Sequence, residues 1–359
     1  MIVIYLMIEF LWNLCKKILS CVKGANRVMN KEYINAMVKA QKSIAQRRLM
    51  VRIAKMYYYD NMSQQAIADV LEISRSNVSR LLRMSREMDI VDIRINDASL
   101  KSIEISEKLK DMFALKQMIV VPSNHDPNIN LSNIGMAAAR YLEKQLKDDM
   151  KVGMSWGLSV YQTISQFTPV VRANIDVVQL MGGTAWDDSY MYGVQLILSF
   201  ADKVGGSAKM LHSPLTVKTR QVHDLLMQED DIQRHFEMTG KLDIAVIGIG
   251  SNLADVSTMV HSNYITKKES EQLWNSGIKC HICGRHVDMD GRQADIEYNK
   301  RVIGIELDDL KKIGNVIAIA GGKHKVAPIA AALRGGYINT LVTDEETAIL
   351  VEREVTGQQ

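Results

Sequence analysis

The stretch Met62–Arg83, MSQQAIADVLEISRSNVSRLLR, predicts two short helices separated by a tight turn. Ser63 and Ser74 each precede a run with helical spacing, and a serine hydroxyl in that position accepts a hydrogen bond from a first-turn amide. A first helix is expected over residues 64–71. Its buried positions are Ala66, Ile67, Val70 and Leu71, and those of the second helix are Val78, Leu81 and Leu82. Ala68 is small enough for the helices to cross closely, so the stretch predicts a helix-turn-helix.

Short polar and basic side chains gather at the start of the second predicted helix. In a helix-turn-helix this end enters the major groove of DNA, where Arg can bind guanine, Asn can bind adenine and Ser can contact phosphate. The DNA-binding residues expected here are Ser63, Ser74, Arg75, Ser76, Asn77, Ser79, Arg80 and Arg83. A helical hairpin with a solvated basic face is the alternative, but it does not explain this concentration. Glu72 stands in the turn where many such motifs carry Gly.

Charge is distributed unevenly along the 359 residues, whose formal net charge is only +3. Residues 31–95 contain twelve Lys and Arg against seven Asp and Glu, a net +5, and residues 1–30 add +3. The rest of the chain, 96–359, therefore carries −5. A basic front suits contact with phosphate and an acidic body does not. The hydrophobic content of 47% indicates a folded protein, and the length indicates two or more domains.

The DNA-binding domain is expected over residues 31–97. Within it, residues 43–59 predict a further helix, and residues 89–96 alternate in the manner of a small strand that would form the wing of a winged variant. Residues 98–115 predict a linker helix, which could pair with the same helix of another copy or be an ordinary surface helix. Its apolar positions are Leu100, Ile103, Leu109 and Phe113.

Residues 1–30 are interpreted as a leader of unknown role. Their apolar run is interrupted by Glu9 and is shorter than the roughly 20 residues that a membrane-spanning helix needs. Lys16 and Lys17 follow this run, whereas a secretory signal carries its positive charge first. A dispensable segment before a start at Met29 and an amphipathic helix at a membrane surface are both open. We expect a cytoplasmic protein that does not enter a membrane.

The four cysteines are too few for a disulfide framework. Cys280 and Cys283, with His281 and His286 beside them, could chemically bind zinc, but a structural zinc site usually needs a second pair of ligands elsewhere. We expect no metal and no cofactor. Both cysteines are interpreted as buried or half-buried strand residues in a reducing compartment.

From residue 116 to residue 359, short apolar runs alternate with amphipathic ones. The expected helices are 132–147, 158–167, 191–204, 219–228, 325–334 and 345–353. The expected strands are QMIVVPS (117–123), VGMS (152–155), IDVVQLMGG (175–183), AKMLHSP (208–214), LDIAVIGIG (242–250), RVIGIEL (301–307), VIAIAGG (316–322) and INTLVTD (338–344). This alternation predicts a doubly wound, mainly parallel α/β sheet with helices on both faces.

Four glycine-rich loops follow predicted strands, at residues 153–159, 180–184, 247–251 and 320–325. Ligands of doubly wound folds bind beyond the carboxyl ends of the strands, where helix N-termini favour anions. Lys323 and Lys325 in the last loop could meet a phosphate. No dinucleotide or nucleotide-loop motif is present, so the loops predict a site for a phosphorylated small molecule. The acidic residues near these loops are sugar-binding candidates or solvated loop residues: Asp187, Asp188, Asp288 and Glu297.

The motifs together resemble one known family. The string IADVLEISRSNVSRLLR is followed in order by VGMSWGLSV, VVQLMGG, DIAVIGIG, VDMDG and AGGKHKVAPIAAALRGGYINTLVTDE, and this series is similar to the SorC family of bacterial sugar-binding transcriptional regulators. The likeness covers about residues 45–355. It implies an N-terminal helix-turn-helix domain, and an effector domain over residues 116–359 that is similar in fold to sugar-phosphate isomerases and deaminases. It also implies operator DNA as a partner, a phosphorylated sugar as effector, and a homotetramer.

From the resemblance and the glycine-rich loops together we expect a particular effector pocket and a particular function. The pocket residues are Ser155, Trp156, Gly157, Ser159, Gly182, Gly183, Gly248, Gly250, Asp288, Gly291, Gly321, Gly322 and Lys325. The expected function is the regulation of a carbohydrate catabolic operon, with no enzymatic activity. The alternative is a sugar-phosphate isomerase or deaminase with a DNA-binding appendage, which would need a positioned carboxylate base. A third interpretation, an architectural DNA binder without a ligand, predicts no response to any sugar phosphate.

Overall fold

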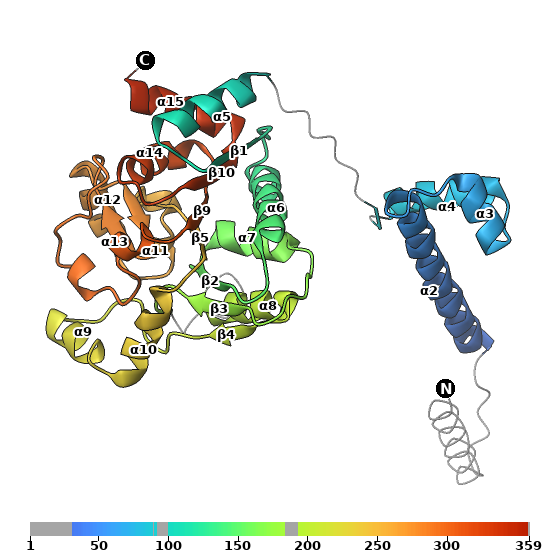
Figure 1. The fold of residues 1–359 in the computed structure, drawn as a ribbon, viewed down its shortest axis with the longest axis horizontal. Coiled ribbons are helices and arrows are strands. Elements are labelled where there is room, and N and C mark those ends of the chain that lie inside the picture. The colour runs from blue at the N-terminus through green and yellow to red at the C-terminus, as the bar shows by residue number, and fades with distance from the viewer. Residues whose placement is uncertain (1–30, 89, 92–99, 184–192, 358–359) are drawn as a thin grey trace, which may run out of the picture. The chain divides into compact units, whose positions relative to one another are not determined.

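The protein folds into two compact units, divided between Asn96 and Asp97 (Figure 1). The structure is a computed structural model that describes residues 31–88, 90–91, 100–183 and 193–357, without the side chains of residues 31–43, 100 and 101. Each unit has a hydrophobic core of its own.

Within the described residues, the smaller unit consists of the helices α2 (Lys31–Tyr58), α3 (Gln64–Leu71) and α4 (Arg75–Glu87). The hydroxyl oxygens of Ser63 and Ser74 accept hydrogen bonds from the first-turn amides of Ala66 (3.1 Å) and Asn77 (3.2 Å). Both predicted N-caps are therefore confirmed. The three helices bury one small core, formed by Met50, Ile53, Ile67, Ala68, Val78, Leu81 and Leu82.

One predicted core position of α3 is wrong. Val70 is 55% exposed, while Ile67 and Ala68 are buried and Leu71 is half-buried. The buried side of α3 is centred between Ile67 and Ala68, and Val70 lies roughly 110° round the helix from that centre at 3.6 residues per turn. Ala68 is buried as expected, where α3 contacts the rest of the core.

Glu72 ends α3 in a left-handed conformation, with φ 53° and ψ 41°. The backbone amides of Glu72 and Ile73 both donate to the carbonyl of Ala68, which caps the last turn of the helix. Glycine adopts this conformation without strain, whereas an L-residue pays roughly 1–2 kcal/mol for it. The side chain of Glu72 is exposed, so the turn accommodates it at the cost of this strain.

The predicted wing over residues 89–96 falls largely outside the described residues, as does the leader. Ile90 and Val91 are described, and their amides both donate to the carbonyl of Ser85 at 2.8 and 3.0 Å. These bonds close the end of α4 and do not test whether a strand follows. The wing and the leader therefore stay predictions.

The larger unit is built on a seven-stranded sheet in which every neighbouring pair of strands is parallel. Its strand order is β1-β10-β9-β5-β2-β3-β4. The strands are β1 (Gln117–Val121), β2 (Lys151–Met154), β3 (Asp176–Gln179), β4 (Ser207–Lys209), β5 (Ile244–Gly248), β9 (Asn315–Ile319) and β10 (Thr340–Asp344). Seven of the eight predicted strands thus contribute to the sheet, which confirms the mainly parallel α/β fold.

The helices divide between the two faces of this sheet because the chain reverses direction across it (Figure 1). Right-handed crossovers from β1 to β4 move along the sheet one way, and those from β4 to β10 move back. The first group of crossovers contains α6 (Pro127–Gln145), α7 (Leu158–Gln166) and α8 (Val194–Val204). The second contains α9 (Arg220–Leu226), α10 (Asp230–Thr239), α11 (Thr258–His261), α12 (Lys267–Asn275), α13 (Leu307–Leu310) and α14 (Val326–Arg334), and α15 (Glu345–Thr356) ends the chain.

The strand pattern does not predict a second, smaller sheet, whose strands lie between β5 and β9 in the sequence. It is antiparallel and consists of β6 (Gly250–Ser251), β7 (Cys280–Ile282) and β8 (Arg285–Val287). Short 3₁₀ turns flank the two sheets at Ala254–Val256, Asn299–Arg301 and Lys323–Lys325.

The predicted strand at 301–307 is wrong, and Arg285 explains why. Apart from isolated bridges at Val302 and Gly304, this segment joins no sheet. The carbonyls of Arg301 and Ile303 accept hydrogen bonds from the backbone amides of Val217 and Gly182, whereas other carbonyls accept from the buried guanidinium of Arg285. That group donates to the backbone oxygens of Asn299, Val302, Gly304 and Ile305 and pairs with the carboxylate of Glu306. One side chain therefore satisfies three carbonyls of this segment, and its remaining backbone bonds run irregularly to two neighbouring segments.

The predicted linker helix is α5 (Leu100–Met112), and it packs within the larger unit beside α15 (Figure 1). Ile105 and Leu109 are buried, whereas Ile103 is half-exposed. Lys108 forms an ion pair with Glu352 of α15. The helix is thereby held against the last helix of the chain.

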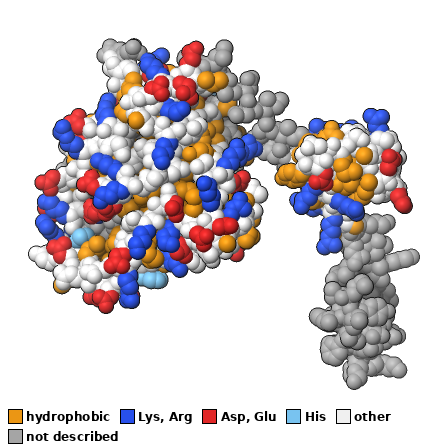
Figure 2. All heavy atoms as spheres, viewed as in Figure 1, with side chains coloured by type: hydrophobic (Ala, Val, Ile, Leu, Met, Phe, Trp, Pro, Cys, Tyr) orange, Lys and Arg blue, Asp and Glu red, His pale blue; other side chains and the backbone are white. Residues whose placement is uncertain are grey.

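Over the visible face of the larger unit, Lys and Arg side chains are interspersed with Asp and Glu (Figure 2). This mixture gives that face no large area of one sign, although the region is acidic in sum. Among the described helices, none combines the length and the apolar character needed to cross a membrane.

Replacing Arg285 with Met leaves several buried carbonyls without a donor, so we expect the free energy of unfolding to fall by at least about 3 kcal/mol. Urea denaturation followed by circular dichroism measures this change. Arg292→Met is the matched control, because Arg292 is exposed and pairs only with the exposed Asp290. Equal, small effects of the two substitutions would show that Arg285 does not hold the 299–306 segment.

Candidate functional site

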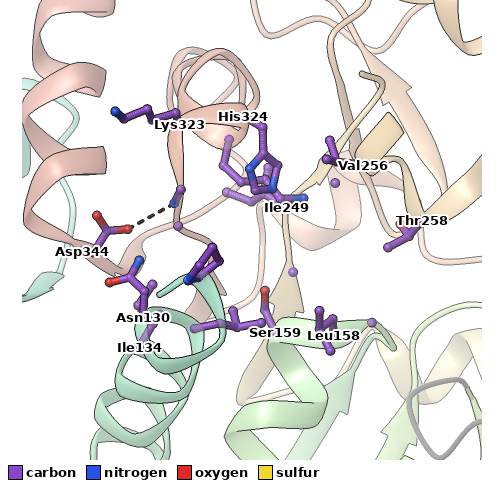
Figure 3. A pocket seen from close by; sticks show the side chains of 18 of the residues that line it. Asn130, Ile134, Leu158, Ser159, Ile249, Val256, Thr258, Lys323, His324 and Asp344 are labelled. Carbon is purple, nitrogen blue, oxygen red and sulfur yellow. Dashed lines mark hydrogen bonds between the residues drawn. The ribbon is translucent and has the colours of Figure 1, made fainter. Parts of the chain in front are cut away.

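A cavity of about 710 Å³ opens at the carboxyl edge of the parallel sheet (Figure 3). Its walls come from the loops after β1, β2, β3, β5, β9 and β10, together with the turn between β7 and β8. Open α/β sheets bind their ligands at this edge. The predicted glycine-rich loops 153–159, 247–251 and 320–325 meet here, and the loop 180–184 contributes Met181.

The wall after β2 leads directly into the first turn of α7. Gly157 is the N-cap, with a φ of 135° that favours glycine, and no described side chain caps this turn. The first-turn amides and the positive end of the helix dipole are therefore available to an anion. Figure 3 shows Leu158 and Ser159 of this turn at the cavity.

Trp156 fixes the position of the loop between β2 and α7. Its indole Nε1 donates to the carbonyl of Gly182 at 2.9 Å, and its ring stacks on Tyr264 with centroids 6.0 Å apart. The hydroxyl of Ser155 accepts a hydrogen bond from the amide of Gly248 at 3.3 Å, which joins the loops after β2 and β5. These contacts preorganise the first turn of α7 for a ligand.

Asp344 orders the wall after β9. Its carboxylate accepts hydrogen bonds from the amide of Gly322 (3.1 Å) and the hydroxyls of Thr347 (2.6 Å) and Ser123 (2.9 Å). Burial, which would raise the pKa of Asp344, is outweighed by hydrogen bonds from Thr347, Ser123 and Asn130, so this pKa lies below its ordinary value. Asp344 is thus a charged structural acceptor that is fully occupied by protein donors.

Lys325 brings a cationic group into the cavity wall. Its ammonium donates to the carbonyl of Ile249 at 2.8 Å, and burial lowers the pKa of Lys325 to about 8. The group is therefore mostly protonated at neutral pH. Burial and the nearby charge of Lys325 lower the pKa of His324 to about 4, so that imidazole is neutral. Lys323 is exposed and pairs with Glu346 at 2.9 Å.

The cysteines and histidines of the β7–β8 hairpin form no metal cluster. No group of three or more His, Cys, Asp or Glu among the described residues could hold a metal ion. Cys280 lies in β7 and Cys283 in the following turn, and burial raises the pKa of each thiol to about 12. His281 and His286 are instead joined through the side chain of Asn252, at 2.9 Å on each side.

The structure brings most predicted pocket residues together. Those that line the cavity are Ser155, Trp156, Gly157, Ser159, Gly248, Gly250, Gly321, Gly322 and Lys325. Four others lie outside it. Gly182 and Gly183 are hydrogen-bonded to Ile303 and Ser213, away from the cavity.

Asp288 and Gly291 lie outside the cavity on the far side of the β7–β8 hairpin. The carboxylate of Asp288 accepts from the amides of Asp290 and Arg292 and so closes its own turn. Gly291 packs against the backbone of Gly335, where a Cβ would approach to 2.2 Å. Of the acidic candidates, Asp187 and Asp188 fall outside the described residues, and Glu297 forms an ion pair with Lys300.

Helix α4 presents the basic and polar side chains singled out in the sequence. Arg75, Ser76, Ser79, Arg80 and Arg83 are exposed, and Asn77 is half-buried. The guanidinium of Arg80 donates to the side-chain oxygen of Asn77 at 2.8 Å, which aligns the two side chains on one side of the helix. Arg83 lies 3.5 Å from Glu87 in an exposed pair. The hydroxyls of Ser63 and Ser74 serve as caps.

Comparison with known proteins identifies the family. A family model described as "Putative sugar-binding domain" matches residues 97–351. The chain is also 30% identical over 307 residues to the sorbitol operon regulator of Klebsiella pneumoniae, covering 85% of this chain and 97% of that regulator. The chain belongs to the SorC family of sugar-binding transcriptional regulators.

A second curated relative and a solved structure are similar over comparable lengths. The deoxyribonucleoside regulator of Bacillus subtilis (strain 168) is 31% identical over 302 residues, covering 84% of this chain and 96% of the regulator. The crystal structure of the full-length sorbitol operon regulator SorC from Klebsiella pneumoniae superposes with a TM-score of 0.75 at 29% identity. It covers 85% of this chain and 98% of that chain.

Several cavity residues of this SorC-family protein are absent from the sequence prediction. Ser123 and Asn130 follow β1, and Thr258 and His281 lie between β5 and β8 in the sequence, whereas Met181 and His324 belong to two of the predicted loops but were not named as pocket residues. The strand at 117–121 was visible in the sequence, so the rule that ligands bind beyond strand ends could have indicated the loop after it. Thr258 and His281 carry no such signal, because the segment between β5 and β8 that contains them shows no regular strand pattern.

Proposed function

We propose that the protein is a cytoplasmic, DNA-binding transcriptional regulator of a carbohydrate catabolic operon, and that a phosphorylated sugar bound in the cavity alters its affinity for the operator. The printed names of its relatives, a sorbitol operon regulator and a deoxyribonucleoside regulator, support control of sugar use. The observation that carries the effector chemistry is the pairing of the uncapped first turn of α7 with the Lys325 ammonium in one cavity.

The two groups fit an effector that has a phosphate on a polar, hydroxyl-rich body. The first turn of α7 offers backbone donors and a positive dipole end, and Lys325 adds a full charge. Hydroxyl and amide side chains from Ser123, Asn130 and Thr258 line the rest of the cavity and suit sugar hydroxyls. The proposed effector pocket consists of the nine sequence-predicted residues that line the cavity, from Ser155 to Lys325.

In the smaller unit, α3 and α4 form a helix-turn-helix whose second helix reads the operator. Arg75, Ser76, Asn77, Ser79 and Arg80 lie at the beginning of α4, the end that meets base edges in this motif. The match with the full-length SorC structure covers 85% of the chain, more than the larger unit alone, which supports a shared DNA-binding front. A wing over residues 89–96 and a homotetramer complete the proposal.

Regulation is favoured over catalysis by the state of the carboxylates in the cavity. Among the described lining residues these are Asp344 and Glu346. Asp344 is occupied by protein donors, and Glu346 pairs with Lys323, so neither is positioned as a base for a sugar carbon. The effector acts by shifting the population between arrangements of different operator affinity.

Replacing Lys325 with Met removes the cationic partner of the phosphate. In a thermal-shift panel of pentose and hexose phosphates with the matching free sugars, we expect the wild type to respond only to phosphorylated members. The variant should bind the responding sugar phosphate about 10–100-fold more weakly, the range for losing a charge-assisted hydrogen bond. Lys312→Met, which removes an exposed lysine paired with Asp309, is the control. Equal responses to a sugar and its phosphate would refute the proposed effector.

The affinity for a sugar phosphate should depend on pH through Lys325. A phosphate monoester becomes a dianion above about pH 6. Lys325, whose pKa is about 8, loses its charge as the pH rises above that value. We expect the highest affinity between these limits, and a fall of about tenfold at pH 9, where about one tenth of the ammonium remains. Isothermal titration calorimetry measures the profile, which should be flat above pH 7 for Lys325→Met.

Arg80→Ala should reduce sequence selectivity in DNA binding and leave the thermal response to sugar phosphates intact. We expect the ratio of operator to scrambled-duplex affinity to fall about 10–100-fold, the cost of one specific base contact. Fluorescence anisotropy measures this ratio on an operator selected from random duplexes by the wild type. Arg86→Ala, near the other end of the same helix, should weaken both duplexes alike. If the affinity ratio is unchanged in Arg80→Ala, α4 is not the recognition helix.

A further inference from the structure

The side chain of Asn252 joins two buried histidines beside the effector cavity. Its Nδ2 lies 2.8 Å from the carbonyl oxygen of Ile278 and 2.9 Å from Nδ1 of His286. A carbonyl oxygen only accepts hydrogen bonds, so the group facing it must be the NH2 of the amide. The orientation of the Asn252 amide is thereby determined by its surroundings.

This orientation determines the tautomers of both histidines. The Asn252 NH2 donates to Nδ1 of His286, which must be unprotonated, and Oδ1 of Asn252 accepts from Nδ1 of His281, which must carry the proton, at 2.9 Å. In a neutral imidazole the other nitrogen has the opposite role. Burial and the nearby His286 and Lys325 keep the pKa of His281 well below its ordinary value, so the ring is neutral. Nε2 of His281 is therefore a hydrogen-bond acceptor.

Thr258 provides the hydrogen that this acceptor needs. Its hydroxyl oxygen lies 3.3 Å from Nε2 of His281, the one hydrogen bond that the described residues give this nitrogen. The ring lies close against Gly250, where an added Cβ would come within 1.8 Å of Nε2, and its Nδ1 is bonded to Asn252. With its proton committed to His281, the hydroxyl of Thr258 presents only lone pairs to the cavity that it lines.

We propose that Thr258, oriented by His281 and Asn252, accepts a hydrogen bond from a hydroxyl of the effector, and that the cavity thereby selects a sugar monophosphate over a sugar bisphosphate. This inference rests on the proposed function. Thr258 contacts the effector, whereas His281 and Asn252 act as positioning residues.

A second phosphate does not fit this part of the cavity, because its oxygens are acceptors that would face the lone pairs of Thr258. A sugar hydroxyl has the proton that Thr258 requires. Figure 3 shows Thr258 on the other side of the cavity from Lys323 and Asp344, and separate from Ser159 in the first turn of α7. The cavity therefore has an anion-binding region at α7 and a hydroxyl-binding region at Thr258.

The test compares Thr258→Val, which keeps the shape and removes the hydroxyl, with Thr258→Ser, which keeps the hydroxyl. Calorimetric titrations of the full chain use two probe pairs, glucose 6-phosphate with glucose 1,6-bisphosphate and fructose 6-phosphate with fructose 1,6-bisphosphate. We expect the wild type to bind a monophosphate at least about tenfold more tightly than its bisphosphate, the size of one well-made hydrogen bond. Thermal melting without ligand verifies that each variant is folded.

Thr258→Val should lower monophosphate affinity about tenfold and leave bisphosphate affinity unchanged, so the selectivity ratio disappears, whereas Thr258→Ser keeps it. A merely structural role would weaken both probes equally. Tighter binding of a bisphosphate by the wild type, or an unchanged ratio in Thr258→Val, overturns this inference and leaves a phosphorylated effector standing. If these probes do not bind the wild type but another sugar phosphate of the thermal-shift panel does, this inference fails alone; if no member of that panel binds, the proposed function fails with it.

Discussion

The parallel alignment of all seven strands in the main sheet is the constraint on which the site depends. Parallel strands place every carboxyl end at one edge, so loops separated by up to about two hundred residues must meet there. The reversal of the chain after β4 puts helices on both faces and leaves this edge uncovered by crossover helices. The cavity thus follows from the topology, and its chemistry follows from which residues end each strand.

Sequence patterns were sufficient to predict the elements whose structure is determined by neighbouring residues. The caps at Ser63 and Ser74 and the apolar runs of the seven parallel strands are properties of neighbouring residues, and the structure confirms them. The segment 301–307 has the same apolar character as those strands. It does not form a regular strand, because the side chain of Arg285 takes the carbonyls of Val302, Gly304 and Ile305. A tertiary hydrogen-bond donor of this kind leaves no periodic signal.

In the effector cavity too, some residues can be recognised from the local sequence, whereas others are placed by tertiary contacts. Glycine and serine after a strand can be recognised in the sequence, and those after β2, β5 and β9 do line the cavity. Gly182 and Gly183 have the same local pattern, yet their amides are bonded to a crossing segment and they lie outside it. His281 enters through the small antiparallel sheet, whose two- and three-residue strands are too short to predict from alternation, and Thr258 enters through the four-residue helix α11.

Burying a charged group is unfavourable, and this limits which side chains in the cavity carry a charge. Burial, together with neighbouring charges for His281 and His324, lowers the pKa of three imidazoles near the cavity, at positions 281, 286 and 324, so they act as neutral groups with defined donors and acceptors. Lys325 keeps its proton at neutral pH and remains cationic. Lys325 and the first turn of α7 therefore attract an anion, whereas the neutral groups distinguish ligands by the direction of hydrogen bonds. Specificity for the sugar body and affinity for its phosphate consequently rest on different residues.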